Sequence, residues 1–223
     1  VYLEGSGSTS LEPGMKVLNN YVHNHSDYGI YLRYMDAPLV EGNQVITNST
    51  DASYYGIYMY YCDNGMKVLR NKVSAPSTTG DYGIRLYYCD ATSGNEGLTA
   101  NNMVTMNVTS STCYGIYSYY SDYQKFYYNS VNIMGSDDTD GRAFYAYSGQ
   151  DIELLNNNFV NSGGGYAIYT NSTSNITSSN YNNLYTTGTD LGYYSGAKSN
   201  LAAWKSATSM DANSVSVSPL FNS

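Results

Sequence analysis

Four segments of the chain repeat one tyrosine-rich pattern, which reads YGIYLRYMD from Tyr28, YGIYMYYCD from Tyr55, YGIRLYYCD from Tyr82 and YGIYSYYSD from Tyr114. The small residue in its second place returns at Gly29, Gly56, Gly83, Gly115, Ala143, Ala167 and Gly192, at intervals of 27, 27, 32, 28, 24 and 25 residues. Units this short cannot bury an apolar face alone, so the repeat predicts that they stack on one another.

Apolar and polar residues alternate after each small residue. The next position holds Ile30, Ile57, Ile84, Ile116, Phe144, Ile168 and Tyr193, and the position after it is tyrosine except at Arg85. A period of two predicts a strand with one buried face and its tyrosines facing outward. A second strand is predicted where an asparagine stands between apolar residues, as in VLNNYV from Val17 and VLRNKV from Val68.

The predicted fold class is all-β, a right-handed parallel β-helix. Stacked layers are about 4.8 Å apart, so eight rungs, counting one that begins at Val1, make a rod about 38 Å long. We expect this β-helix to span residues 1–200. Residues 201–223 are expected to form a capping segment, in which Trp204 covers the open end of the solenoid.

The pattern G-I-x-L, a small residue and then V-x-x-N-x-V resembles the right-handed parallel β-helix family, the pectate-lyase-like superfold that includes NosD-type repeats. The segment from Asn180 to the C-terminus resembles the closing segment of β-helix domains in large secreted proteins of Bacteroidota, which implies an extracellular or cell-surface location. The resemblance also implies an internal asparagine ladder made of Asn20, Asn43, Asn71, Asn102, Asn129 and Asn157. It does not fix the function, because this superfold hosts enzymes and adhesins alike.

Composition narrows the range of partners. The chain has a formal net charge of −8 and only ten Lys and Arg residues, which argues against binding to nucleic acid or to an anionic membrane surface. No apolar run approaches the ~18 residues that suggest a transmembrane segment. Cys62 and Cys89 occupy the same inward place on consecutive rungs, which suits either a disulfide or two stacked free thiols.

The outward tyrosines are the candidate ligand-binding face. Two columns are expected to contain Tyr31, Tyr58, Tyr60, Tyr87, Tyr117, Tyr119, Tyr145 and Tyr147. One interpretation is purely structural, because stacked aromatic side chains stabilise a sheet. The other is a binding surface for a polysaccharide, for another protein or for a second copy of the chain, since a long amphipathic face exceeds what a monomer usually exposes.

Aspartates form another row, at Asp36, Asp63, Asp90 and Asp122. They suit turns at the strand ends, or Ca²⁺ binding between neighbours. In polysaccharide lyases of the resembled superfold, acidic rows act with Ca²⁺ and a basic residue, which makes Arg85, Asp63 and Asp90 the candidate catalytic residues of an alternative enzyme hypothesis.

A local acidic run, GSDDTDGR, adds Asp137, Asp138 and Asp140. It suits a weak Ca²⁺ site or a plain polar loop, because the full spacing of a calcium-binding loop is missing. No other cofactor is expected. The even repetition of the acidic residues favours a non-catalytic module, used for adhesion, for self-assembly into filaments or for glycan binding, over a polysaccharide lyase or hydrolase.

Overall fold

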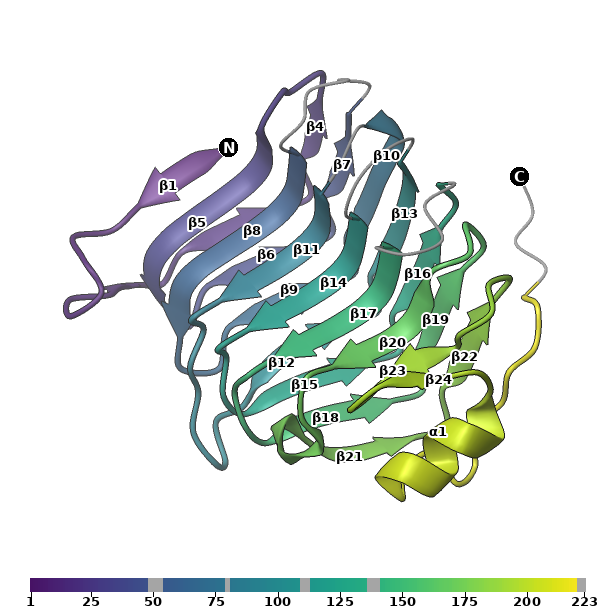
Figure 1. Ribbon diagram of the computed structural model, residues 1–223. Coiled ribbons are helices and arrows are strands. Elements are labelled where there is room, and N and C mark those ends of the chain that lie inside the picture. Colours follow the sequence, from purple (N-terminus) through teal and green to yellow (C-terminus); the bar gives the residue numbers. More distant parts are fainter. Residues whose placement is uncertain (48–53, 79–80, 109–112, 136–140, 220–223) are drawn as a thin grey trace.

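The computed structural model describes residues 1–47, 54–78, 81–108, 113–135 and 141–219. The chain winds into a coil whose walls are three β-sheets, and successive turns advance along one axis (Figure 1). Sheet 1 contains β1 (Tyr2–Glu4), β5 (Tyr28–Asp36), β8 (Tyr54–Asp63), β11 (Asp81–Tyr87), β14 (Cys113–Tyr119), β17 (Gly141–Tyr147), β20 (Tyr166–Thr170), β23 (Gly192–Tyr193) and β24 (Ala197–Lys198), with β2 (Glu12–Pro13) beside β5.

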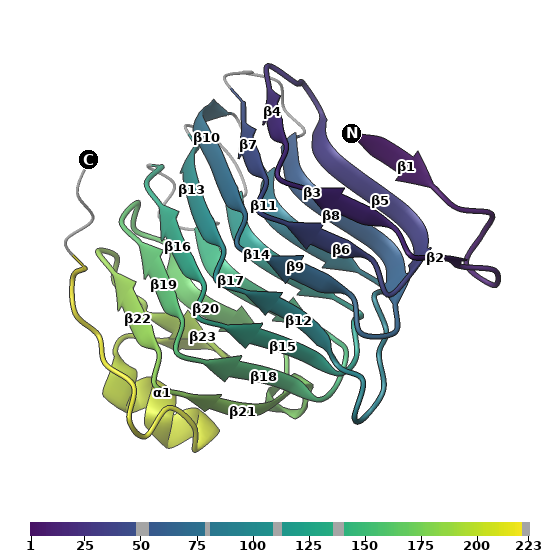
Figure 2. The same cartoon turned by 180° about the vertical axis from the view of Figure 1, so that it is seen from behind.

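Sheets 2 and 3 form the other two walls, and sheet 2 crosses the front of the rod in Figure 2. Sheet 2 contains β3 (Lys16–Leu18), β6 (Leu39–Glu41), β9 (Lys67–Leu69), β12 (Gly97–Ala100), β15 (Gln124–Tyr127), β18 (Ile152–Leu155) and β21 (Ile176–Asn180). Sheet 3 contains β4 (Tyr21–His23), β7 (Gln44–Ile46), β10 (Lys72–Thr78), β13 (Met103–Val108), β16 (Ser130–Ile133), β19 (Asn158–Asn161) and β22 (Asn183–Thr186). A short 3₁₀ helix (Thr173–Asn175) precedes β21.

Equivalent residues of successive rungs lie beside one another in parallel register. Ile30 of β5 pairs with Ile57 of β8, and Ile57 pairs with Ile84 of β11. The first rung follows the same register, because Tyr2 pairs with Tyr31. The predicted parallel β-helix is therefore confirmed. The expected eight rungs are slightly too many, because over the described residues sheets 2 and 3 have seven strands each.

The asparagine of each rung lies at a corner and not inside a strand, which corrects the expected second strand. In the first rung, Asn20 separates β3 of sheet 2 from β4 of sheet 3. Each ladder asparagine uses its backbone N–H and its side-chain amide to donate to Oδ1 of the asparagine one rung ahead. For Asn71 these bonds to Asn102 are both 3.0 Å long, and its side-chain amide also donates to the carbonyl oxygen of Val40.

The asparagine ladder is longer than predicted. It continues from Asn157 to Asn182, whose backbone N–H then donates to the hydroxyl of Ser214 at 2.8 Å. The stack of buried corner amides is thus satisfied at its last rung by a residue from the C-terminal segment.

In each repeat, the glycine and the residue that follows it both face the interior of the coil. Both Gly29 and Ile30 are buried, whereas Tyr28 is exposed and Tyr31 half-buried. A Cβ placed on Gly29 would meet Cγ1 of Val45, a core residue of sheet 3. Two successive inward residues interrupt the period of two, as at a β-bulge, and so two tyrosines three positions apart both face outward.

The last rung shows that the assignment of Gly192 to the row of small residues is wrong. Gly192 pairs with Ile168, so it occupies the isoleucine place, and Tyr193 is the partner of Tyr169. The fully buried Trp204 of α1 (Leu201–Thr208) lies where an isoleucine side chain would project, because a Cβ on Gly192 would come 2.8 Å from its ring. Helix α1 closes this end of the rod (yellow in Figure 1).

The cap is held by a buried carboxylate. Asp211 accepts hydrogen bonds from indole Nε1 of Trp204 at 2.8 Å, from Oγ of Ser179 at 2.9 Å, from the Asn182 amide at 3.0 Å and from the Ser214 hydroxyl at 2.6 Å. The expected division at residue 200 falls at the N-cap of α1, where Oδ1 of Asn200 accepts the backbone N–H of Ala203.

Cys62 and Cys89 are free, and a third cysteine, Cys113, is also buried. Sγ of Cys62 lies 3.4 Å from the carbonyl oxygen of Leu32, and Sγ of Cys89 lies 3.4 Å from that of Met59. Of the two alternatives, the structure therefore has stacked thiols.

Candidate ligand-binding face

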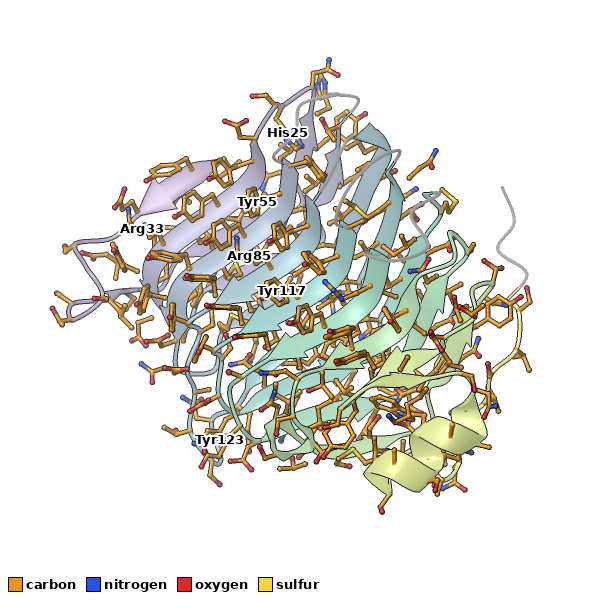
Figure 3. All side chains as sticks on the ribbon, in the orientation of Figure 1. His25, Arg33, Tyr55, Arg85, Tyr117 and Tyr123 are labelled. Atoms are coloured by element: carbon orange, nitrogen blue, oxygen red, sulfur yellow. The ribbon has the colours of Figure 1, made fainter. Side chains whose placement is uncertain are left out.

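The outward side of sheet 1 carries four columns of side chains, which we call the tyrosine face (Figure 3). The columns are numbered in chain order within a rung. Column one contains Tyr28, Tyr55, Tyr82, Tyr114 and Tyr166; column two Tyr2, Tyr31, Tyr58, Tyr117, Tyr145, Tyr169 and Tyr193; column three Tyr60, Tyr87, Tyr119 and Tyr147; and column four Tyr34, Tyr61, Tyr88 and Tyr120.

Most neighbouring rings of one column are stacked almost parallel from rung to rung, although the pairs Tyr2–Tyr31 and Tyr145–Tyr169 of column two are edge-on, at 77° and 75°. The centroids of Tyr87 and Tyr119 are 4.6 Å apart with an interplanar angle of 4°, and those of Tyr31 and Tyr58 are 4.8 Å apart at 8°. The parallel register of the strands imposes this spacing, because equivalent residues lie one strand separation apart. A ring with a parallel neighbour on each side has both of its faces covered, as Tyr87 has between Tyr60 and Tyr119.

The middle of column two is buried although it points outward, whereas Tyr2 at its start is 54% exposed. Tyr58 is 8% exposed and Tyr117 7% exposed. Column one covers this part of column two from the side, since the rings of Tyr55 and Tyr58 are 4.9 Å apart at 15°. Burial raises the pKa of the Tyr58 and Tyr117 phenols well above the usual tyrosine value, because the phenolate would lose hydration.

Column four lies at a bend of the chain, which falls near the end of β5 and β8 and directly after β11 and β14. Tyr34, Tyr61, Tyr88 and Tyr120 all have left-handed backbones, with φ of 61°, 50°, 52° and 46°. This conformation is unfavourable for a side chain with a Cβ. It places the rings of Tyr61, Tyr88 and Tyr120 edge-on against column three, as for Tyr87 and Tyr88 at 4.7 Å and 88°, and edge-to-face packing offsets part of the cost.

Arginines replace tyrosine at three places in the columns, the first being Arg33 in column three, which pairs with Tyr60. The guanidinium of Arg85 stands in column two, 4.5 Å from the ring centroids of both Tyr82 and Tyr87, and donates to the Tyr55 hydroxyl at 3.2 Å. Arg142 stands in column one, 4.2 Å from the Tyr169 centroid, and donates to the Tyr114 hydroxyl at 2.7 Å. Cation–π contacts of this kind stabilise an arginine among aromatic rings.

Positive charge predominates among the columns. The charged side chains there, within the described strands, are Glu4, Arg33, Arg85 and Arg142, of which Glu4 and Arg33 form an ion pair at 2.9 Å. In the part of the chain that the structure describes, Arg85 forms no ion pair. The face therefore attracts anions although the chain as a whole is acidic.

The aspartates lie in a row beyond column four and are bonded to one another's backbones. Oδ1 of Asp63 accepts the backbone N–H of Asp90 at 2.9 Å, and Oδ1 of Asp90 accepts that of Asp122 at 3.1 Å. Desolvation raises the pKa of Asp63 to about 6, against the opposing effect of its hydrogen bond from Asp90, and desolvation likewise raises the pKa of Asp90. These hydrogen bonds join successive rungs, whereas the turns expected for the row would lie within one rung.

No contact that the structure describes joins Arg85, the basic residue of the enzyme hypothesis, to its acidic residues Asp63 and Asp90. Arg85 pairs in the sheet with Tyr58, and Asp63 follows Tyr58 by five residues along β8. Across the described ranges, no hydrogen bond or ion pair links Arg85 to Asp63 or Asp90. The hypothesis stays a prediction.

Calcium binding also stays a prediction. Asp137, Asp138 and Asp140 lie outside the described residues. Elsewhere in the described chain, no group of three or more His, Cys, Asp or Glu side chains is placed to hold a metal ion.

Sequence reasoning found columns two and three but missed columns one and four. Strict alternation places Tyr55 inward, whereas the paired inward residues Gly56 and Ile57 turn it outward. The glycine inside a strand pattern was the available signal, since it marks a bulge. For column four the sequence offers no comparable signal, because tyrosine is an unusual residue at a left-handed corner.

None of the described helices is long and apolar enough to cross a membrane.

One comparison with known proteins agrees with this architecture. Neither the curated proteins nor the solved structures include a match to this chain. Residues 4–92 match the family described as right handed beta helix region. The same three-sheet rung continues from that segment through β22, so the described chain has one fold throughout, the right-handed parallel β-helix.

Proposed function

We propose that this chain is a non-catalytic module that acts outside the cell or at its surface, and that its tyrosine face binds an extended polysaccharide. The observation that carries the proposal is the chemical uniformity of the face. Within the described strands, its column positions hold tyrosine, arginine and glutamate, and the aliphatic side chains of the same strands point inward.

This composition suits a hydroxylated polymer better than a protein surface. Protein interfaces are enriched in tyrosine and arginine as well, but they usually have an apolar centre with a polar rim. The tyrosine face instead repeats phenol hydroxyls in rows along the rod, with one rung about 4.8 Å from the next. A polysaccharide that lies along the axis would meet a hydrogen-bonding group at each rung, together with the arginines.

Most rings would contact the sugar through their edges and hydroxyls. Stacking of a sugar on a ring face, as considered from the sequence, requires a free face. Tyr87 and the other inner rings have parallel neighbours on both sides, whereas Tyr28 begins column one, is exposed and stacks on Tyr55. Sugar stacking is therefore confined to column ends such as Tyr28, and hydrogen bonding to hydroxyls predominates elsewhere.

A glycan array tests the proposal with a variant that removes hydroxyl groups but keeps the rings. Tyr60→Phe, Tyr87→Phe and Tyr119→Phe are combined, so that the stack of column three is preserved. The matched control combines Tyr21→Phe, Tyr128→Phe and Tyr181→Phe, which are exposed tyrosines on sheet 3 and at its corner with sheet 2.

We expect the wild type and the control to bind a polysaccharide and the column-three variant to lose most of that binding. If the wild type binds no glycan, or if both variants bind equally, the proposal is wrong. Size measurements on the same samples then show whether the chains associate with one another instead.

A further inference from the structure

We propose that columns three and four are sites of oxidative tyrosine coupling, in which neighbouring rungs become joined by dityrosine bonds when the protein meets a peroxide oxidant. The inference does not depend on glycan binding. It rests on ring geometry and on the difference in burial between the columns.

The geometry brings coupling partners together before any reaction. Tyr87 and Tyr119 are held parallel with centroids 4.6 Å apart, and Tyr88 and Tyr120 lie beside them at 5.4 Å and 24°. With rings in this arrangement, the carbons ortho to the two hydroxyls are neighbours, and side-chain rotation can bring them into bonding distance. Reactants held side by side in one molecule react as if highly concentrated.

The reaction balances as follows. Each phenol loses one electron and its hydroxyl proton and becomes a tyrosyl radical. The two radicals form a carbon–carbon bond between their ortho positions, and each ring then loses the ortho hydrogen as a proton while its oxygen regains one. The sum is one new bond, two protons released and two electrons transferred to the peroxide, whose O–O bond is cleaved.

Burial selects columns three and four over column two. Coupling needs a phenol that can release its proton to water, and Tyr87 and Tyr119 are half-buried while Tyr120 is exposed. Tyr58 and Tyr117 of column two are only 8% and 7% exposed, so water has little access to their phenols. Equally close pairs such as Tyr31 and Tyr58 are therefore expected to couple slowly.

The chain offers a direct readout of the proposed bond. Cleavage after arginine and lysine releases residues 86–125 as one peptide, and a second cleavage after Glu96 separates residues 86–96 from residues 97–125. Tyr87 and Tyr88 lie in the first piece, and Tyr119 and Tyr120 lie in the second. A dityrosine bond keeps the two pieces joined, with the loss of two hydrogen atoms.

The experiment oxidises the intact chain with persulfate and a light-activated ruthenium complex, in buffer and again in guanidinium chloride. Mass spectrometry measures the joined peptide, and gel electrophoresis measures links between chains. The test variant is Tyr119→Phe with Tyr120→Phe, which keeps both rings. The control is Tyr128→Phe with Tyr181→Phe, at exposed tyrosines away from sheet 1.

We expect the joined peptide to form at least tenfold faster in the folded monomer than in the unfolded chain. The test variant should abolish it, and the control should leave it unchanged. Equal rates in folded and unfolded protein, links mainly between chains, or an undiminished joined peptide in the test variant would each overturn the inference.

Discussion

Gly56 lies directly against Val73. A Cβ at residue 56 would be closer than 3.0 Å to Cγ1 of Val73 and 2.5 Å from the carbonyl oxygen of Gly83, distances that real Cβ atoms do not adopt. This absence of a side chain allows two successive residues to turn inward, and so it allows Tyr55 and Tyr58 to stack on the outside.

Gly56→Ala should therefore destabilise the protein by about 1–3 kcal/mol, the usual cost of overpacking a core. The free energy of unfolding, measured by denaturant titration, checks this. Gly7→Ala is the matched control, because a Cβ at residue 7 would have nothing within 4 Å. Equal stability of the two variants would show that the close approach to Val73 can relax without cost.

Asn102→Ala should be among the most damaging changes at a polar residue. It leaves the backbone N–H of Asn71 and the carbonyl oxygen of Val68 buried without their partner, at about 1–3 kcal/mol for each group. Asn20→Ala, at the exposed first corner, should cost less, because water can replace the lost bonds. Thermal unfolding of both variants followed by circular dichroism compares them, and similar losses would contradict the explanation.

Trp204 and Gly192 should be energetically coupled. Trp204→Ala removes a fully buried ring and should cost about 3–5 kcal/mol. Gly192→Ala should also destabilise the wild type, because its Cβ would lie 2.8 Å from the indole, but it should cost less when Trp204 is already alanine. A double-mutant cycle measures this coupling free energy, and simple additivity would show that the ring does not occupy that place.

Asp63 should make stability depend on pH. Its pKa is about 6 in the folded state and 3.8 as its ordinary value, so between these pH values the folded protein binds more protons than the unfolded chain. The free energy of unfolding should then fall as the pH rises from 4 to 6 through this group, and the loss remains at neutral pH.

Asp63→Asn should remove that contribution while keeping an oxygen for the Asp90 N–H. It should stabilise the protein by about 1 kcal/mol at pH 7, after discounting for solvent around the carboxylate, and by almost nothing at pH 4. Burial lowers the pKa of His25, so this group makes the free energy of unfolding rise with pH. Its contribution is the same in the variant and the wild type, and therefore cancels in the comparison. Asp27→Asn, at an exposed position, is the matched control for the exchange of an aspartate for an asparagine.

The sequence was sufficient to predict the strands of sheet 1 and the apolar residues in the interior of the rod. Ile30, Ile57 and Ile84 follow a period of two and all are buried, and the asparagine row gives the ladder directly. The details that depend on contacts between distant segments could not be read locally. Gly192 resembles the other small residues by its neighbours, and only the position of Trp204 shows that it belongs in the isoleucine place.

The candidate site was predicted less completely for a related reason. The alternation rule places side chains on one of two sides but does not say how many outward rings will bury one another. Tyr58 was correctly placed outside the coil, yet Tyr55 and its neighbours on adjacent rungs leave it only 8% exposed. Ring-on-ring burial depends on the bulge at Gly56, which a strict period does not contain.

The two ladders of the rod have opposite polarity. In the asparagine ladder, the backbone N–H of each member points to the rung ahead, as from Asn71 to Asn102, whereas in the aspartate row it points to the rung behind, as from Asp90 to Asp63. If a rung were inserted upside down, its contact with the preceding rung would bring N–H donors against N–H donors in the asparagine ladder. In the aspartate row, the same contact would bring oxygen acceptors against oxygen acceptors. The two ladders together therefore allow each new turn of the coil to be added in one orientation only.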